Sequence, residues 1–583
     1  MKNAILSATF DQMADVMEIL GEDRFRINSY RKVARIIGEL PTDVAVLLAE
    51  GRLAKTPGIG KSSLAKIKEF VETEGIAAHE ALLERIPPTL LELLQIQGVG
   101  PKGVKVIYEN LDVTGLDDLK TALDDGSVAE LPGFGVKKAA AIRKGLDFLE
   151  QSTGRIRLDQ AVEAAAMVIA YLKELPGIET IQPAGSLRRQ AETIGDVDIL
   201  VTTGKGKRKS AQSPEQIIQF FTEGPFVERV LAAGETKGSA IVQTETIPVQ
   251  VDVRVVPAES FGAALQYFTG SKAHNVRLRE IAVKAKLKLN EYGLFKGEKM
   301  IAGVAEEDIY AKLGLDFVAP ELREDRGEVE AAKGNALPKL VELGDIKGDF
   351  HMHTVASDGR SSIEEMAEAA QALGYAFICI TDHSQSSLIA GGQTPKGLAK
   401  QIEQIRKIDA KLKSITILAG GEVDILGDGS LDFDDGLLSD LDFVVASIHS
   451  GMTGPREKVT ARTLKAMDNP YVTSIGHPTG RLIGQREAMD LDMGAVIKHA
   501  AATGTALEIN ANPWRLDLKD THCKMAVEKG VKLAIGTDAH STAGLNLMSF
   551  GVATAARGWA KGEDVLNTLS VAQLKAFLRA KRA

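Results

Sequence analysis

The chain has few cysteines and no long apolar segment, and both features restrict the classes of protein to which it can belong. Only two cysteines occur in 583 residues, Cys379 and Cys523, so a disulfide-stabilised scaffold is excluded. No apolar run approaches the ~20 residues that a membrane helix needs. The residues after Met1 lead into a polar helical pattern and lack the apolar stretch of a signal peptide. We therefore expect a cytoplasmic protein with no membrane contact.

An excess of positive charge is also missing. The formal net charge is −9, with 70 Lys and Arg against 79 Asp and Glu. Net charge averages over several domains, and this length suggests about four of them. Basic residues nevertheless gather in five short segments, namely 24–35, 61–68, 102–105, 137–144 and 205–209. The overall balance therefore argues neither for nor against a nucleic-acid partner.

One short pattern recurs three times in the first 150 residues, which otherwise read as amphipathic helix. Each copy has two glycines around one apolar residue, and the pairs are Gly58 and Gly60, Gly98 and Gly100, and Gly133 and Gly135. Glycine permits a tight turn, and the amides that open the next helix can point at a phosphate oxygen. Lys61, Lys102 and Lys137 add cations beside the turns. We interpret these copies as helix-hairpin-helix motifs that bind a DNA backbone; a helical bundle with glycine turns is the alternative.

A mixed α/β region begins near residue 155 and carries three acids on two expected strands. Residues 194–201 read as a strand, on which Asp196 and Asp198 would share one face. In residues 247–256 valines alternate with polar residues, so Asp252 lies on a polar face. Repulsion among the three carboxylates is relieved if they hold divalent cations such as Mg²⁺ or Mn²⁺. A solvated edge strand is the plainer alternative for the first pair.

Residues just upstream suit a phosphate ligand. Gly185 and Ser186 can offer an amide and a hydroxyl to phosphate oxygens, and Arg189 can neutralise developing charge. Two metals held by the acids would activate a 3′-hydroxyl and stabilise a leaving group. The pattern therefore predicts nucleotidyl transfer.

The motifs GSLRR, GDVDILV, VDVR and YFTGS together resemble those of a family X DNA polymerase, with a nucleotidyltransferase fold over about residues 1–318. The resemblance implies that Asp196 and Asp198 bind both metals and that Asp252 serves the catalytic metal as base. It also implies roles for residues around the substrate. Tyr267, Phe268 and Gly270 would line the sugar pocket, Asn275 and Arg279 would contact the nascent base pair and template, and Arg254 would take part in opening and closing.

Lys66 follows the first glycine turn. Some members of the family have lyase activity and use a lysine near this position to attack an abasic sugar. Ser62 occupies a position that is often basic in such proteins. A Schiff-base role and a simple DNA phosphate contact both remain open for Lys66.

We interpret a polar, charged stretch at residues 323–339 as a linker. A third region, with a different composition, follows it. Seven short apolar runs there alternate with helical patterns such as 362–373 and 394–412. This alternation predicts parallel strands closing into a barrel, with the chemistry at the carboxyl ends of the strands.

Candidate metal ligands follow the apolar runs. They are His351, His353, Asp358, His383, Glu422, His449, His477, Asp538 and His540, and they include six of the ten histidines. Imidazole mixed with carboxylate suits Zn²⁺, Mn²⁺ or Fe²⁺ better than Mg²⁺. Nine ligands suffice for two to three metals that would deliver a metal-bound hydroxide to phosphorus.

This second pattern resembles the PHP (polymerase and histidinol phosphatase) family over about residues 346–575. All nine ligand positions are filled, which favours an active hydrolase. Arg481 and Arg515 are expected either to contact phosphate or to form surface salt bridges. Asp382, beside His383, is expected to orient a ligand rather than to bind metal.

The sequence thus predicts a multidomain α/β protein. Its expected parts are helix-hairpin-helix domains at 1–80 and 81–153, a palm at 154–259, a small α+β thumb at 260–318, a linker at 319–345 and a seven-stranded PHP barrel at 346–583. We expect a monomeric, nucleoid-associated repair polymerase that uses dNTPs on gapped or 3′-recessed DNA and carries a 3′–5′ exonuclease. AP-endonuclease or 3′-end processing activity is also open. Three rivals remain, namely a PHP small-molecule phosphatase, a first half that serves mainly as a DNA-binding module, and a template-independent transferase.

Overall fold

A computed structural model describes residues 2–38, 44–56, 58–73, 75–96, 98–152, 154–203 and 212–582. The chain forms two compact units. The first comprises residues 1–153 with the short stretch 484–487, and the second comprises 154–483 and 488–583. The basic loop predicted at 205–209 lies outside the described residues. Within the described ranges, no helix is both long enough and apolar enough to cross a membrane.

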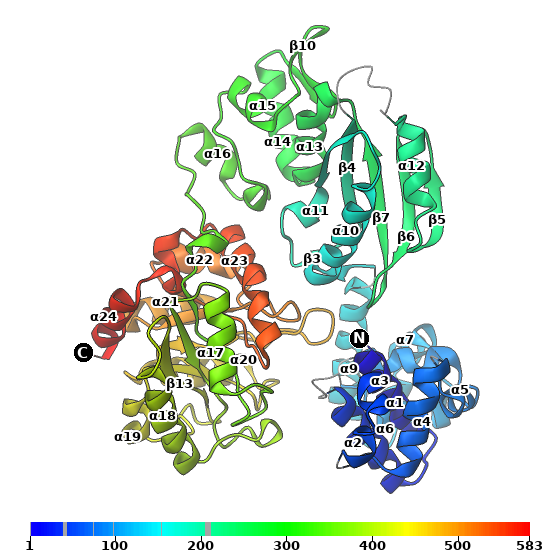
Figure 1. Cartoon of the computed structure of the whole chain (residues 1–583), viewed down its shortest axis with the longest axis vertical. Coiled ribbons are helices and arrows are strands. Elements are labelled where there is room, and N and C mark those ends of the chain that lie inside the picture. Colours follow the sequence, from blue (N-terminus) through cyan, green and yellow to red (C-terminus); the bar gives the residue numbers. More distant parts are fainter. Residues whose placement is uncertain are drawn as a thin grey trace. The chain divides into compact units, whose positions relative to one another are not determined.

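The first unit is built from helices joined by short turns and loops (Figure 1). Its α-helices are α1(Lys2–Ile19), α2(Arg24–Gly38), α3(Val44–Ala49), α4(Lys61–Thr73), α5(Ala77–Leu83), α6(Pro101–Leu111), α7(Leu116–Asp124), α8(Ser127–Glu130) and α9(Gly135–Ser152). Two short 3-10 helices, η1(Leu53–Lys55) and η2(Pro88–Gln95), precede α4 and α6. Two large apolar clusters lie in its core, one around Phe10 and Ile37 and the other around Leu90 and Ile107, and a small third cluster includes Met17 and Ile27.

The three glycine turns predicted from the sequence lie where expected. They precede α4 and α6 and open α9, and each follows a short helix. Gly58 has φ 96°, and a Cβ there would come within 2.5 Å of Ile36, so only glycine fits this turn without a shift. Lys61, Lys102 and Lys137 are exposed beside the turns. The Lys66 Nζ lies 3.2 Å from the Ser62 hydroxyl.

The second unit begins with a five-stranded sheet in the order β2-β4-β7-β6-β5. The strands are β2(Ile178–Pro183), β4(Val197–Thr203), β5(Val227–Ala233), β6(Lys237–Gln243) and β7(Pro248–Val255). Helices α10(Leu158–Leu172) and α12(Pro214–Thr222) cover one face, on which the valines of β7 pack (Figure 1). Ser213 caps α12 and Pro214 opens it, which fixes where that helix begins. The alternate residues of β4 and β7 project from the opposite face.

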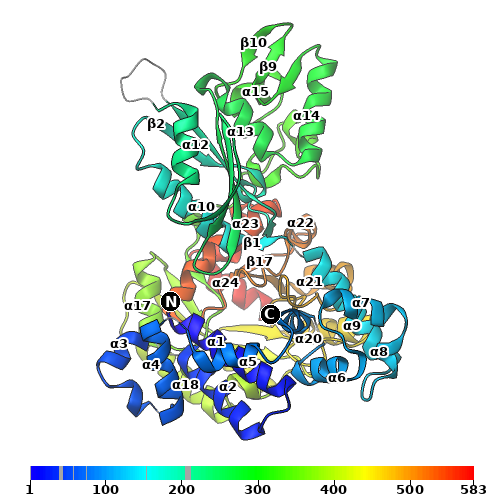
Figure 2. The ribbon, with the colours of Figure 1, turned by 90° about the vertical axis from the view of Figure 1, so that its right-hand side faces the viewer.

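A smaller α+β part follows the sheet (Figure 2). It contains α13(Phe261–Thr269), α14(Lys272–Lys284), α15(Glu306–Lys312) and an antiparallel sheet of β8(Lys288–Asn290), β9(Gly293–Lys296) and β10(Lys299–Ala302). The segment interpreted as a linker is folded. It contains η4(Pro320–Leu322), α16(Glu328–Lys333) and η5(Leu343–Asp345), and the side chains of Arg323 and Glu328 are buried. Arg323 forms a buried ion pair with Glu306, and Glu328 accepts a hydrogen bond from His274, so these polar residues are not exposed as their composition suggested.

The remaining residues form the predicted barrel. Seven parallel strands pair in chain order, namely β11(Gly348–Asp349), β12(Phe377–Ile380), β13(Thr416–Asp424), β14(Phe443–Ser447), β15(Ser474–Ile475), β16(Ala506–Asn510) and β17(Leu533–Gly536). A parallel bridge between Met352 and Ala539, just beyond the first and last strands, nearly closes the barrel.

Helices surround this barrel, as the alternating pattern predicted. They are α17(Ile363–Ala372), α18(Pro395–Asp409), α19(Asp435–Asp440), α20(Arg456–Met467), α21(Met493–Thr503), α22(Asp520–Glu528), α23(Met548–Arg557) and α24(Val571–Arg582). Phe350, Phe377 and Phe443 fill the interior, while the intervening apolar residues of the strands pack outward against the helices. The carboxyl ends of all seven strands therefore meet at one end of the barrel.

Two candidate metal sites

The first candidate site lies where β4 and β7 run side by side. The strands are parallel and in register, with Asp198 directly opposite Asp252, so both carboxylates project from one face. Asp196 lies in the bend just before β4, not on it, because the expected strand is interrupted between β3(Thr193–Ile194) and β4. The prediction of one continuous strand is thus wrong. Oxygens of the three carboxylates still lie within 4.8 Å of one another.

Crowding of the three acids changes their ionisation. Burial, together with the charges of Asp196 and Asp252, raises the pKa of Asp198 to about 7. Burial acts in the same direction on Asp252, but hydrogen bonds, first among them one from Lys237, outweigh it and lower its pKa. The Lys237 Nζ lies 2.5 Å from Asp252 Oδ2. A cation is therefore favoured at this position, and three carboxylate donors fit a hard divalent ion.

Lys237 was not predicted from the sequence. It lies on β6, opposite Arg254 in the neighbouring strand. Its contact with Asp252 depends on the pairing of β6 with β7. No local pattern around Lys237 indicates that these two strands are neighbours.

The phosphate-binding candidates follow β2 directly. Gly185 has φ 59°, and a Cβ there would lie 2.5 Å from Asp198 Oδ2. Glycine is therefore required for the close approach to the acids. Ser186, the second residue of α11(Gly185–Arg188), is partly exposed. Arg189 donates to Glu324 at 3.0 Å and to the Thr269 carbonyl at 2.7 Å, which fixes the position of its guanidinium.

The residues of the YFTGS motif form one connected group. Asn275 donates through Nδ2 to the carbonyls of Tyr267, at 2.6 Å, and Gly270. A Cβ on Gly270 would lie 2.7 Å from the Asn275 amide oxygen, so the turn fits only glycine. Arg279, one turn further along α14, donates to the Asn275 carbonyl. The structure brings these residues together, and their roles remain predictions.

Arg254 lies beside this group. It projects from β7, two residues after Asp252, and its guanidinium stacks over the Phe268 ring, 4.6 Å from the centroid. Its buried Nε has no hydrogen-bond partner within the described residues. The stacking links the acids to the YFTGS motif.

The second candidate site lies at the carboxyl ends of the barrel strands, where all nine predicted ligands converge. Glu422 is at its centre and is almost fully buried. Its Oε1 lies 2.9 Å from His477 Nε2 and 3.2 Å from His449 Nε2. Its Oε2 lies 2.9 Å from His383 Nδ1 and 3.5 Å from His351 Nε2. One carboxylate thus serves several imidazoles, as a bridging ligand would.

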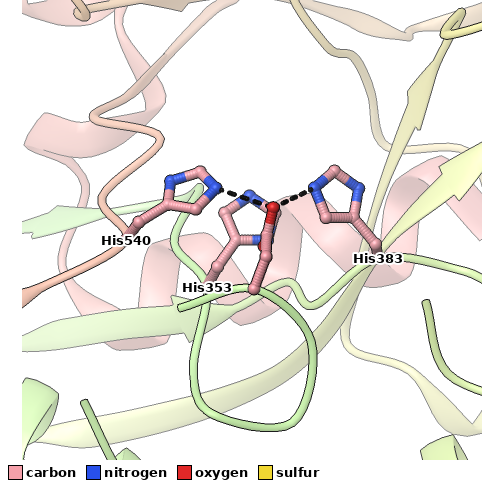
Figure 3. Close-up of side chains that lie close together, drawn as sticks. His353, His383 and His540 are labelled. Atoms are coloured by element: carbon pink, nitrogen blue, oxygen red, sulfur yellow. Dashed lines mark ion pairs between the residues drawn. The ribbon is translucent and has the colours of Figure 1, made fainter. Parts of the chain in front are cut away.

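Three overlapping groups within the site have metal-like spacing. Figure 3 shows His353, His383 and His540 turned toward one another; Asp358 completes this group, with its Oδ2 3.3 Å from His540 Nε2. The other two groups are His351, His353 and Asp538, and His383, Glu422 and His449. His477 belongs to none of the three groups and contacts Glu422 instead. Ligand atoms within each group lie within 4.8 Å of one another. The site therefore contains groups that could hold metal ions, and the number of two to three ions stays a prediction.

Charges in the site favour cations. Burial disfavours the protonated form of His383, yet Glu422 and Asp358 outweigh it and raise its pKa to about 10. Buried nitrogens of His351 and His353 lack hydrogen-bond partners within the described residues. Unpaired buried nitrogens beside carboxylates fit metal coordination, because a cation satisfies both.

The backbone at two ligands is in an unusual conformation. His477 has φ 25° and Asp538 has φ 55°, values that non-glycine residues seldom adopt. Such conformations persist where the surrounding structure enforces them, and they concentrate at functional sites.

Two acids orient the histidines and were not predicted. Glu508, on β16, accepts from His351 Nδ1 at 2.6 Å, and Asp424, at the end of β13, lies 3.0 Å from His449 Nδ1. Such carboxylates fix the tautomer and direction of a ligating imidazole. The sequence did offer a signal for Glu508. It is a lone acid within an apolar strand, and a buried acid needs a polar or charged partner.

The structure shows different contacts for the three other residues singled out in the PHP part, Asp382, Arg481 and Arg515. Asp382 accepts hydrogen bonds from Thr354 and Gln401, so it braces the ligand-bearing loops. Arg481 donates to Glu192 at 2.7 Å and to two backbone carbonyls, which supports the salt-bridge alternative. Arg515 lies 3.7 Å from Asp538 and has a buried nitrogen without a partner among the described residues, which keeps it open for phosphate.

Comparison with known families covers nearly the whole chain. Residues 1–76 match a helix-hairpin-helix domain and 90–147 a SAM-like helix-hairpin-helix tandem. Residues 155–258 match the DNA polymerase beta palm, 264–324 the DNA polymerase beta thumb and 349–512 the PHP domain. A Bacillus subtilis (strain 168) protein, DNA polymerase/3′-5′ exonuclease PolX, is 38% identical over 571 residues, which cover 98% of either chain. The chain belongs to the family X DNA polymerases that carry a PHP domain.

Further relatives resemble the PHP part of this family X chain. A probable phosphatase of Thermoanaerobacter sp. (strain X514) is 31% identical over 247 residues, or 40% of this chain and 95% of its own. A probable phosphatase of Caldanaerobacter subterraneus subsp. tengcongensis is 32% identical over 246 residues, or 40% and 91%. The resemblance to family X and PHP proteins and the predicted fold class are thus confirmed. The polymerase and PHP domains imply DNA binding and divalent-metal dependence.

Proposed function

We propose that this family X chain is a DNA-directed DNA polymerase that fills short gaps during repair. The pairing of Asp198 with Asp252 on adjacent strands, with Asp196 within 4.8 Å, supports the proposal most directly. These acids would hold two Mg²⁺ or Mn²⁺ ions, which supply activation of the primer 3′-hydroxyl and charge neutralisation at the leaving group. Asp252 would act as the base. Gly185, Ser186 and Arg189 would bind the triphosphate of a dNTP.

Further residues of the first half would position the substrates. Tyr267, Phe268 and Gly270 would line the sugar pocket, and Asn275 would contact the nascent base pair. DNA contacts are proposed for Arg254 and Arg279 and for the hairpin residues Gly58, Gly60, Lys61, Lys66, Gly98, Gly100, Lys102, Gly133, Gly135 and Lys137. The favoured substrate is gapped or 3′-recessed DNA, and the hairpins would hold its phosphates without reading sequence.

We further propose a metal-dependent 3′–5′ exonuclease in the barrel. The clustering of imidazoles and carboxylates around Glu422 supports metal-assisted phosphoester hydrolysis, and the named activity of the Bacillus subtilis relative makes DNA the favoured substrate. The ligands would hold two to three Zn²⁺, Mn²⁺ or Fe²⁺ ions, which supply an activated hydroxide. Arg515 would bind a phosphate oxygen. Residues 1–153 would bind DNA, 154–318 would carry out polymerisation and 346–583 hydrolysis, in a monomer associated with the nucleoid.

A small-molecule phosphatase is the second candidate for the barrel, because the relatives that match this part alone are named probable phosphatases. Release of dNMP from a 3′-recessed duplex and hydrolysis of p-nitrophenyl phosphate, both with Mn²⁺, separate the two candidates. Faster turnover of the monoester than of DNA at equal concentration would favour the phosphatase.

Two variants test whether the activities are separate. Asp198→Ala should reduce primer extension at least about 1,000-fold and leave dNMP release unchanged, because a ligand to both proposed polymerase metals is lost. His351→Ala combined with His353→Ala should do the reverse. Chelation with EDTA should stop both. If either variant removed both activities equally, two independent sites would be excluded.

A further inference from the structure

Residues 384–393 form a loop beside the second metal site, within the segment that joins β12 to α18. Its two ends are fixed to the site: Ser384 N donates to the Glu422 carbonyl at 2.9 Å, and Gln393 N donates to the His383 carbonyl at 2.8 Å. The Ser387 hydroxyl donates to Asp424 at 2.7 Å. The base of the loop is therefore part of the barrel mouth.

The tip of this loop is apolar and exposed to solvent. Leu388 is 84% exposed and Ile389 is completely exposed, the highest values among the large apolar side chains of the barrel part. A third aliphatic residue lies nearby on the loop that carries Asp358. Val355 is 63% exposed, and a Cβ at Gly391 would lie 3.6 Å from the Ser357 carbonyl, so the two loops touch. Most other large side chains of this part are buried, which makes the exposed tip unusual.

The tip is also close to the predicted ligands. The Ser387 hydroxyl lies 3.4 Å from His449 Nδ1, and the Cα of Leu388 is one peptide bond, about 3.8 Å, from that of Ser387. Stacked nucleotides repeat about every 3.4 Å along one strand. A phosphodiester held by the histidines would therefore place the terminal base, or the base next to it, against the aliphatic tip.

We infer that Leu388 and Ile389, with Val355, form an apolar wedge that separates the terminal base pair at a DNA 3′ end. Proteins that unstack DNA insert aliphatic side chains of this kind between base steps. The wedge would deliver a single-stranded 3′-terminal nucleotide to the metal site. This inference rests on the proposed exonuclease function.

The test compares paired and unpaired 3′ ends. Leu388→Ser combined with Ile389→Ser should lower dNMP release from a fully paired duplex end about tenfold or more. Release from the matching single-stranded oligonucleotide should change less than about threefold, because an unpaired end needs no wedge. Since both side chains lie in water, the substitutions remove no buried contacts and leave folding intact. A duplex with two terminal mismatches should restore most of the rate.

Leu373→Ser is the matched control. Leu373 is 45% exposed at the end of α17, just before β12, and so lies at the opposite end of the barrel from the ligands. It should keep the wild-type ratio of paired to single-stranded rates. Equal losses on both substrates in the loop variant, no loss, or loss of bound Mn²⁺ would each overturn the wedge. A wild-type protein inactive on both DNAs would instead refute the exonuclease on which the wedge depends.

Discussion

Gly185 holds the backbone against the carboxylate of Asp198, at φ 59° and with no room for a Cβ. Gly185→Ala must displace the acid or the turn, because the added carbon would lie 2.5 Å from Oδ2. Misplacement of a reacting group by about 1 Å lowers rates about 100-fold. We expect that loss in single-nucleotide gap filling, with dNMP release unchanged.

Gly314→Ala separates crowding from backbone strain. Gly314 has φ 73° but no atom within 4 Å of an added Cβ, so this variant carries a similar strain without a steric clash. It should keep gap filling within about threefold of wild type. If both variants lost activity equally, strain rather than the approach to Asp198 would explain the glycine.

Glu508 controls the direction of His351 without lying among the predicted ligands. Its Oε1 lies 2.6 Å from Nδ1, which leaves Nε2 directed at the site. Glu508→Gln should weaken Mn²⁺ binding about 10- to 100-fold, as loss of an orienting carboxylate does in other metal sites. Isothermal titration of the metal-free protein measures this change. Asp468→Asn, in the surface pair with His499, should bind as wild type; weakened binding there too would rule out a specific role for Glu508.

At the scale of elements, the segment 319–345 shows what composition cannot predict. Its charges indicated an exposed linker, yet Arg323 pairs with Glu306 inside the fold, and Glu328 accepts from His274 at 2.7 Å. A buried polar pair and a solvent-exposed one consist of the same residue types, so composition alone cannot distinguish them. The strands of the barrel were predictable, in contrast, because short apolar runs alternate with helical patterns, and six of the seven runs carry or precede a predicted metal ligand.

Strand alternation explains the success at Asp198 and Asp252 and also the error at Asp196. The period of two correctly placed the valines of β7 on the core face and the acid on the other. It could not show that Gly195 and Asp196 form a bend between two strands. Contacts that depend on strand order, such as that of Lys237, were beyond any local pattern.

The buried His274 makes the stability of this element depend on pH. Burial lowers the pKa of His274, and the bond to Glu328 only partly opposes it. The unfolded chain therefore takes up a proton below about pH 6.5 that the folded chain resists, and the unfolding free energy falls as pH drops below that value. His274→Phe cannot take up this proton. Its melting temperature should fall less than that of wild type between pH 7.5 and pH 5.5; equal falls in differential scanning calorimetry would contradict the assignment.

At the scale of the whole molecule, the chain carries a net negative charge, and the DNA that its domains bind is negatively charged as well. The excess of 79 acidic over 70 basic side chains is a property of the sum, and part of it lies in the two metal sites, which bound cations would neutralise. The cations beside the three glycine turns remain exposed. DNA affinity should therefore depend on these few lysines and not on the net charge.

Salt dependence tests this distribution directly. Replacing Lys61, Lys102 and Lys137 with alanine removes three proposed phosphate contacts, and each contact contributes about 0.9 to the slope of log affinity against log salt concentration. The slope for a gapped duplex, measured by fluorescence anisotropy in KCl, should become shallower by about 2.7. Alanines at Lys413, Lys529 and Lys575, which are exposed in the barrel part away from the ligands, change the net charge by the same amount. If these control substitutions flattened the slope equally, bulk charge and not the hairpins would govern DNA binding.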